Sequence, residues 1–401
     1  MKLRPDTFAF TALLALLTAL GPFSVDMYLA SLPDIGRSLA TSPAAVQLTL
    51  SVYLIGYAVG QLLYGPLSDR FGRKPVLLVA LTGYCIASVG CAIAPTIETL
   101  LVARALQALG SSGSIVIARA VVRDLYEGAR AGRELALMGA IFSLAPVIAP
   151  SVGGLLQSGF GWRANFVVLT VIGLSAILLV WLMLPETLRT RSSAPPGLGA
   201  IIAGYGEILR HPSFLAYLGL IGASFGGVFA WISASPFVLQ ELYGLTPFWF
   251  GFAFAGASVG FLTGSILSTR LVTRLGLDRT IGIGACCLAV GGLGSIAAVA
   301  FGAAIPVVVA VAFYTCGMGL VQPQTIAGAI MPFPHKAGAA SSLVGVAQMI
   351  SAALVGIGVG QALGHSAWPL ALPLAALGCL TLLLWVLTRR VRASAQAYDK
   401  S

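Results

Sequence analysis

Charged side chains are scarce in this 401-residue sequence. Lys and Arg number 23 and Asp and Glu number 13, together 9% of the chain, against roughly 25% in an average soluble domain. So few charges cannot cover the surface of a water-soluble protein of this length, which excludes a soluble enzyme. Hydrophobic residues make up 58%, and the 48 glycines follow no triplet period, which excludes disordered and collagen-like chains. A polytopic, all-α membrane protein remains.

Signals for metal, redox and nucleotide chemistry are also missing. No Gly-x-x-x-x-Gly-Lys-Ser/Thr loop occurs, which disfavours an ATP-driven pump. The six cysteines lie in apolar runs without a CxxC pair, so we expect small core residues. Three scattered histidines predict no metal site, and we expect no cofactor. The net charge of +10 lies at segment ends, so no nucleic-acid partner is expected. The histidines are His211, His335 and His365.

Apolar segments of the length that spans a bilayer, about 20 residues, recur along the whole chain. The first follows Lys2 and Arg4 as in a signal peptide, but it has no clear cleavage site and is interpreted as a spanning helix. The segments lie at about 8–30, 46–64, 75–94, 98–121, 135–157, 164–184, 213–240, 248–267, 280–301, 304–326, 337–363 and 368–388, where boundaries carry an error of about two to four residues.

Basic residues test this count. Twelve spans place both termini on one side, and 20 of the 23 Lys and Arg then fall on that side. Only Arg37 and Arg163 fall in the alternate loops, and Arg104 falls inside a helix. Because positive residues accumulate on the cytoplasmic side, we expect cytoplasmic termini in a bacterial inner membrane. The 20 residues are Lys2, Arg4, Arg70, Arg73, Lys74, Arg119, Arg123, Arg130, Arg133, Arg189, Arg191, Arg210, Arg270, Arg274, Arg279, Lys336, Arg389, Arg390, Arg392 and Lys400.

A polar, turn-rich stretch near the midpoint divides the segments into two sets of six. It predicts an N-terminal bundle over 1–186, a cytoplasmic linker over 187–212 and a C-terminal bundle over 213–401. A weak repeat at an offset of 200 supports duplicated halves: Gly56, Gly60 and Arg70 recur as Gly256, Gly260 and Arg270. Glycines four residues apart also allow close helix contact.

The strongest motif, 65–75, reads Gly-Pro-Leu-Ser-Asp-Arg-Phe-Gly-Arg-Lys-Pro. We expect a tight cytoplasmic turn between the second and third helices; a plain topology signal explains its positive charges but not their order. The motif resembles the signature loop of the major facilitator superfamily. The second half has a degraded counterpart at 264–274 that lacks the acid.

Two further motifs extend this resemblance. Residues 101–110 resemble the superfamily's fourth-helix motif with its buried arginine. Residues 149–154, Ala-Pro-Ser-Val-Gly-Gly, resemble the fifth-helix motif of drug/proton antiporters, with plain helix packing as the alternative. Proline and paired glycines let a helix bend against a neighbour. Similarity over nearly the whole chain is to the Bcr/CflA subfamily, exporters of bicyclomycin- and chloramphenicol-type drugs, and rests also on 24–33, 47–53, 120–126, 161–163 and 333–338.

The resemblance implies a set of gating residues around these motifs. In the superfamily the aspartate of the signature loop holds the cytoplasmic gate shut. Asp69 is expected to face the N-terminus of the eleventh helix, where the helix dipole favours an anion, or to pair with Arg123. Arg73 is expected to pair with Asp124. The set is Gly65, Asp69, Arg70, Gly72, Arg73, Lys74, Arg123, Asp124, Pro146, Pro150, Gly153 and Gly154.

Asp26 and Arg104 are the two charges that matter most inside the spans. From the helix rise they lie roughly 6–9 Å and roughly 9 Å inside the outer ends of their helices, so they share a depth. Such charges need a partner or a water-filled cavity. We hypothesise that Asp26 takes up and releases the proton and that Arg104 is its conformational partner; a static structural ion pair is the alternative. Ala30, where many relatives carry proline, leaves the acid in place.

The substrate cavity is expected to be apolar and aromatic with a few polar groups. The resulting prediction is a proton-coupled drug exporter, without catalytic residues, acting as a monomer on small molecules. The alternatives are a proton-coupled metabolite transporter, which the sequence does not separate from it, and a membrane enzyme or a passive channel, which it disfavours. Cavity candidates, each also open to ordinary packing, are Met27, Tyr28, Gln107, Phe225, Phe229, Trp231 and Tyr314.

Overall fold

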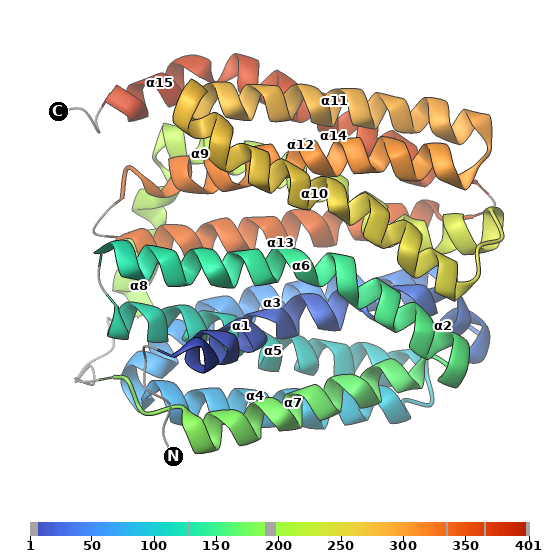
Figure 1. The fold of residues 1–401 in the computed structure, drawn as a ribbon, viewed down its shortest axis with the longest axis horizontal. Coiled ribbons are helices and arrows are strands. Elements are labelled where there is room, and N and C mark those ends of the chain that lie inside the picture. The colour runs from blue at the N-terminus through green and yellow to red at the C-terminus, as the bar shows by residue number, and fades with distance from the viewer. Residues whose placement is uncertain (1–6, 127, 189–197, 334–335, 365, 398–401) are drawn as a thin grey trace. The chain divides into compact units, whose positions relative to one another are not determined.

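The computed structural model describes residues 7–126, 128–188, 198–333, 336–364 and 366–397. Within these ranges the regular structure is helical and contains no strand, and twelve helices are long and apolar enough to cross a membrane (Figure 1). The predicted all-α fold with twelve spanning helices is therefore confirmed. Residues 189–197 of the predicted linker, the terminal basic residues Lys2, Arg4 and Lys400, and two of the three histidines, His335 and His365, lie outside the described residues.

The chain divides into two compact units, Met1–Pro195 with Pro247–Gly251, and Pro196–Thr246 with Phe252–Ser401. In the first unit, α5 is the central helix and packs against α1, α3 and α4, while α7 packs along α4. Its elements are α1 (Phe8–Asp26), η1 (Leu29–Ser31), α2 (Leu32–Ser38), α3 (Pro43–Phe71), α4 (Arg73–Ile93), α5 (Ile97–Leu125), α6 (Gly128–Phe160) and α7 (Arg163–Met183).

In the second unit, α11 packs against both α12 and α14, and α9 packs against α12, α13 and α14. Two helices in it were not predicted: α8 lies in the stretch interpreted as a linker, and α15 follows the last spanning helix. The elements are α8 (Leu198–Leu209), α9 (Pro212–Phe237), η2 (Val238–Leu242), α10 (Pro247–Leu275), α11 (Leu277–Phe301), α12 (Ala304–Ile330), α13 (Ala337–Ala362), α14 (Trp368–Leu387) and α15 (Arg389–Ala397).

Local sequence signals fix several helix starts. Ser42 caps α3, its hydroxyl accepting a hydrogen bond from the Ala45 N–H at 3.2 Å, and Pro43 takes the first helical position, where its missing N–H costs nothing. A capping box between Thr96 and Thr99 starts α5, which satisfies two amide donors at once. These caps fix the N-terminal ends of both helices.

The signature motif is mostly helical, which corrects the prediction of a loop. Helix α3 continues to Phe71 and α4 begins at Arg73, so the turn consists of Gly72 alone. Gly72 has φ 101°, a conformation that a side chain disfavours. Gly72 therefore forms the predicted bend. Asp69 and Arg70, the acid and the first arginine of the motif, lie on the last turn of α3.

The predicted close helix contacts at the glycine pairs are present in the first unit. A Cβ on Gly56 would lie 2.9 Å from the Ala105 carbonyl oxygen, and one on Gly60 would lie 1.9 Å from the Ser112 hydroxyl. Both contacts join α3 to α5. In the second unit Gly260 meets α12 in the same way, 2.0 Å from the carbonyl oxygen of Ala312. Small residues thus let the helix backbones approach closely.

Candidate functional site

Asp26 is the last residue of α1, and the chain turns at Met27 and Tyr28 before η1 begins. The side chain is buried, with 5% of the residue exposed. Helix α6 comes against the turn at Gly153, where a Cβ would lie 1.6 Å from the Met27 carbonyl oxygen. Because only glycine leaves room for that carbonyl, the antiporter-like motif on α6 fixes the backbone directly beside the acid.

Arg104 lies on α5 and is completely buried. Its Nη1 donates to the Ser24 carbonyl oxygen at 2.9 Å and to Gln107 Oε1 at 2.6 Å. The guanidinium carbon lies 4.3 Å from the ring centre of Tyr28 and 4.2 Å from that of Tyr53. Two aromatic faces at this distance stabilise a cation that has left water, so α5 is held to α1 and α3 through this one side chain.

Buried hydrogen bonds extend from Arg104 to α4. Gln107 donates from Nε2 to the Ser88 hydroxyl at 2.8 Å, and the Ser24 and Tyr84 hydroxyls lie 2.8 Å apart. The Tyr53 hydroxyl lies 2.6 Å from that of Ser111. Buried polar groups that are satisfied in this way specify one packing arrangement. The candidate Gln107 thus belongs to a polar network inside the first unit.

The structure does not record an ion pair between Asp26 and Arg104, both of which lie in its described part. Two guanidinium nitrogens of Arg104, Nε and Nη2, have no hydrogen-bond acceptor. Their neighbours are aromatic faces instead of a carboxylate. Asp26 and Arg104 are therefore both buried in the first unit, but they form no ion pair with each other. Their coupling during proton transfer stays a prediction.

The remaining cavity candidates lie in tightly packed surroundings. Met27 and Tyr28 are fully buried, and the Tyr28 ring lies 5.7 Å from that of Phe166. In the second unit the Phe225 and Phe229 rings lie 5.6 Å apart, and Trp231 stacks on Phe254 at 5.7 Å. Tyr314 is fully buried, and a Cβ on Gly227 would lie 1.8 Å from its hydroxyl oxygen. Each set belongs to its own unit, and a role in substrate binding stays a prediction.

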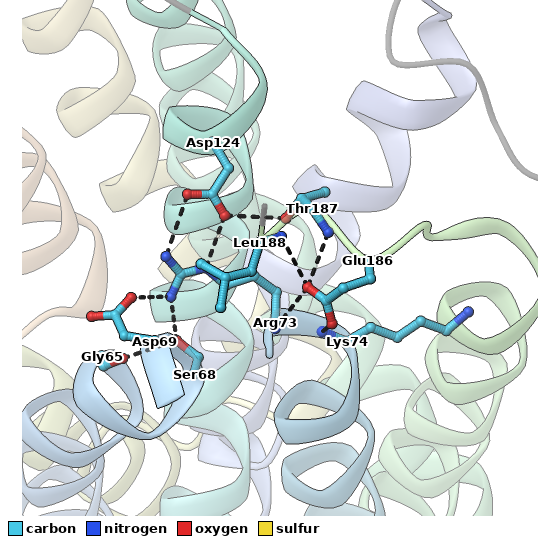
Figure 2. Close-up of polar contacts among 9 residues, drawn as sticks. All are labelled: Gly65, Ser68, Asp69, Arg73, Lys74, Asp124, Glu186, Thr187 and Leu188. Atoms are coloured by element: carbon cyan, nitrogen blue, oxygen red, sulfur yellow. Dashed lines mark hydrogen bonds and ion pairs between the residues drawn. The ribbon is translucent and has the colours of Figure 1, made fainter. Parts of the chain in front are cut away.

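Arg73 is the centre of a charge cluster at one end of the first unit (Figure 2). Its Nε donates to Asp124 Oδ2 at 2.8 Å, and its Nη2 donates to Asp124 Oδ1 at 3.3 Å. Its Nη1 donates to Asp69 Oδ1 at 2.5 Å and to the Ser68 hydroxyl at 2.7 Å. The Arg73–Asp124 pair is present as predicted, and the same arginine joins the ends of α3, α4 and α5.

Glu186, which the sequence reasoning did not single out, completes this cluster. Its carboxylate accepts from the backbone N–H groups of Arg73 at 3.0 Å and Lys74 at 3.2 Å. It also accepts from those of Thr187 and Leu188, both at 3.0 Å, as Figure 2 shows. An anion at this position stabilises the helix start, where N–H groups lack partners and the dipole is positive. The segment after α7 thus caps α4.

Other predicted gating residues lie around the cluster or in α6. Asp69 pairs with Arg73, and no ion pair joins it to Arg123, which is exposed. The exposed Arg70 guanidinium lies 5.1 Å from the ring of Phe71. Lys74 donates to the Trp181 carbonyl oxygen at 2.8 Å. The Gly65 carbonyl oxygen accepts from the Ser68 hydroxyl, Pro146 and Pro150 lie inside the continuous α6, and Gly154 is buried.

The second unit contains a related junction that the sequence reasoning also missed. Gly276, with φ 81°, separates α10 from α11 as Gly72 separates α3 from α4. Asp278, in the first turn of α11, accepts from Nε of the fully buried Arg392 at 2.8 Å. Arg392 Nη2 also donates to the Trp385 carbonyl oxygen at 2.8 Å. In each unit, the segment after the last spanning helix binds the start of the third spanning helix. Glu186 binds α4 in the first unit, and Arg392 binds α11 in the second.

Comparison with known proteins agrees with this architecture. The family model described as Major Facilitator Superfamily matches residues 14–356. The chain belongs to the major facilitator superfamily. As a member of that superfamily it is a transporter rather than an enzyme, and it is a multi-pass membrane protein.

Individual relatives place this superfamily member among proteins named for drug resistance. It is 30% identical to the bicyclomycin resistance protein homolog of Haemophilus influenzae, over 89% of this chain and 90% of the relative. It is 30% identical to the chloramphenicol resistance protein of Pseudomonas aeruginosa, over 84% of this chain and 80% of the relative. An MFS-type transporter of Bacillus subtilis, YdgK, is 34% identical over 87% and 88%. The resemblance to the Bcr/CflA subfamily is thereby confirmed.

Solved structures confirm the fold. The crystal structure of a D-xylose-proton symporter superposes with a TM-score of 0.76 at 18% sequence identity, covering 95% of this chain and 97% of the other. At this identity the match concerns the fold alone, twelve spanning helices in two six-helix bundles.

Proposed function

We propose that this transporter exports small amphiphilic or apolar drugs in exchange for protons, by alternating access. The relatives named for bicyclomycin, chloramphenicol and multidrug resistance support the drug class. The observation that carries the proposal is Asp26, a carboxyl buried in a membrane span without an ion-pair partner among the described residues.

The chemistry of such a carboxyl supports proton coupling. Burial in apolar surroundings favours a protonated acid, whereas a nearby guanidinium favours the anion. Asp26 is buried at the turn that Gly153 of α6 contacts, and Arg104 holds two donors without acceptors in the same unit. Movement of the acid between these environments during transport binds and releases one proton. Inward proton movement supplies about 2.3 kcal/mol per charge per 100 mV, enough for export of a neutral drug against a gradient of tens-fold.

The charge distribution supports an orientation. Of the 23 Lys and Arg, 20 fall on the side of the termini, so we place both termini in the cytoplasm of a bacterial cell with the protein in the inner membrane. We retain the division into an N-terminal bundle over 1–186, a linker over 187–212 and a C-terminal bundle over 213–401, and a monomer as the transporting form.

Proton coupling is testable in proteoliposomes that enclose a pH-sensitive dye. An imposed chloramphenicol or bicyclomycin gradient is expected to drive proton movement with the unchanged protein and none with Asp26→Asn. Asp34→Asn is the matched control, because Asp34 lies on α2 near the outer end of the same span and pairs with Arg37. Drug-driven proton flux that persists with Asp26→Asn refutes the role of this acid.

A susceptibility panel in a host that lacks its own pumps tests the drug class. Expression of the unchanged protein is expected to raise resistance to at least one drug of the panel, and Asp26→Asn is expected to abolish the effect. Uniform susceptibility across the panel, with drug-free proteoliposomes that still exchange protons for an amino acid, favours a metabolite transporter instead.

A further inference from the structure

The second unit has few acids at the end that holds α8, the start of α11 and α15. It has two acids at that end among the described residues, and both are already paired. Glu207 of α8 forms an ion pair with Lys336 at the start of α13, and Asp278 of α11 forms one with Arg392 of α15. All other charged side chains described there are arginines: Arg210, Arg270, Arg274, Arg279, Arg389 and Arg390.

These six arginines, here called the basic rim, are exposed. Their guanidinium groups form no hydrogen bond or ion pair within the described part of the chain. The corresponding end of the first unit differs, because Asp69, Asp124, Glu134 and Glu186 all lie there among its basic residues. Among the described residues, basic side chains outnumber acids by eight to two at this end of the second unit and by seven to four at the corresponding end of the first, so the excess of positive charge is larger in the second unit.

The position of α15 holds two members of the rim in place. The buried Arg392 fastens the helix to Asp278, and the Ser213 hydroxyl at the start of α9 donates to the Val391 carbonyl oxygen at 3.0 Å. With Arg392 turned inward and Val391 half-buried, Arg389 and Arg390 are exposed. Figure 1 shows α15 beside the starts of α9 and α11. The helix thus presents a fixed pair of cations immediately after the last spanning helix.

We propose that the basic rim is a binding surface for anionic phospholipid headgroups of the leaflet on the side of the termini, with Arg389 and Arg390 on α15 as its fixed contacts. Clusters of four to eight basic residues next to a spanning helix attract anionic lipid, by about 1 kcal/mol for each Lys or Arg. The rim meets this description because its members lie at the ends of spanning helices and lack internal counter-ions. The headgroup phosphate supplies the acceptors that the chain does not.

The experiment measures lipid binding to the full-length protein in detergent, by the anisotropy of a fluorescent short-chain phosphatidylglycerol at low salt. Phosphatidylcholine with the same dye is the neutral comparison. The unchanged protein is expected to bind phosphatidylglycerol more tightly than phosphatidylcholine, and Arg389→Gln/Arg390→Gln is expected to bind it about 30-fold more weakly, from two lost charges. Because this assay uses neither drug nor proton gradient, it succeeds or fails independently of the proposed transport activity.

Two comparison variants make the result specific. Arg389→Lys/Arg390→Lys keeps both charges and is expected to retain binding, which separates lost charge from a misplaced helix. Arg130→Gln/Arg133→Gln removes two exposed charges from the first unit and is expected to leave the affinity unchanged. The proposal is overturned if the first-unit control weakens binding equally, or if the protein binds both lipids with equal affinity. It is also overturned if free glycerol phosphate displaces the labelled lipid as efficiently as unlabelled phosphatidylglycerol does.

Discussion

The ion pair between Arg73 and Asp124 offers the sharpest energetic test of the charge cluster. The arginine side chain is 8% exposed and the aspartate 19%, and two parallel hydrogen bonds of 2.8 and 3.3 Å join them. Loss of one partner of a buried pair costs about 3–5 kcal/mol, largely because the other charge stays behind. Arg73→Met is therefore expected to destabilise the protein by about 3–5 kcal/mol. Asp69, 53% exposed, adds at most about 1 kcal/mol to that loss.

The decisive quantity is the coupling between the two sites. If the pair acts as one unit, Arg73→Met/Asp124→Leu loses less stability than the sum of the single changes, by about 1.5–3 kcal/mol. Unfolding in mixed micelles with a rising fraction of sodium dodecyl sulfate measures the four free energies. Lys74→Met is the matched control, because the ammonium group of that half-buried lysine donates only to a backbone carbonyl. Single effects that add within about 0.5 kcal/mol refute the reasoning.

Three further changes probe other contacts. Gly153→Ala places a methyl group 1.6 Å from the Met27 carbonyl oxygen, in the turn after α1, and is expected to abolish folded protein, judged by size-exclusion of a fluorescent fusion. Gly159→Ala, with no atom within 4 Å, is expected to behave as the parent. Asp278→Asn leaves Arg392 buried without its anion and is expected to cost about 3 kcal/mol in the same micelle titration; an unchanged midpoint contradicts this. Arg104→Lys loses the planar contact with two tyrosine rings and is expected to lower the free energy of unfolding by about 2 kcal/mol. A thermal unfolding midpoint equal to that of the parent contradicts this expectation.

Much of the architecture could be predicted because a bilayer imposes a simple pattern. Apolar runs and the asymmetry of basic residues give the number of spans, and observed helices begin within a few residues of the predicted segments. The errors lie at the ends. Helix α3 runs through the signature motif to Phe71, with Pro66 inside it. Glycine and proline in the last turns of a long helix therefore did not end it, as the sequence had suggested. Helices α8 and α15, of 12 and 9 residues, are shorter than a bilayer span of about 20 residues, so a search for spanning segments passes over them.

The candidate site could be predicted in its members but not in its contacts. The sequence marks Asp26 and Arg104 because charges inside apolar spans are rare, and it gives the Arg73–Asp124 pair by resemblance. It does not show that tyrosine rings lie on Arg104, since Tyr28 comes from the turn after α1 and Tyr53 from α3, far from Arg104 in the sequence. Glu186 was missed for a similar reason: its partners are backbone N–H groups more than a hundred residues away, and such acceptors leave no trace in residue type.

Gly72 has a mechanical consequence. Because a single residue connects α3 and α4, and Glu186 occupies the space a Cβ would need, 2.7 Å away, these two helix ends cannot tilt separately without breaking the cap. Asp69 on the last turn of α3 accepts from Arg73 Nη1, and the backbone N–H of the same arginine donates to Glu186, so we expect a displacement of Asp69 to reach the residues after α7 that cap α4.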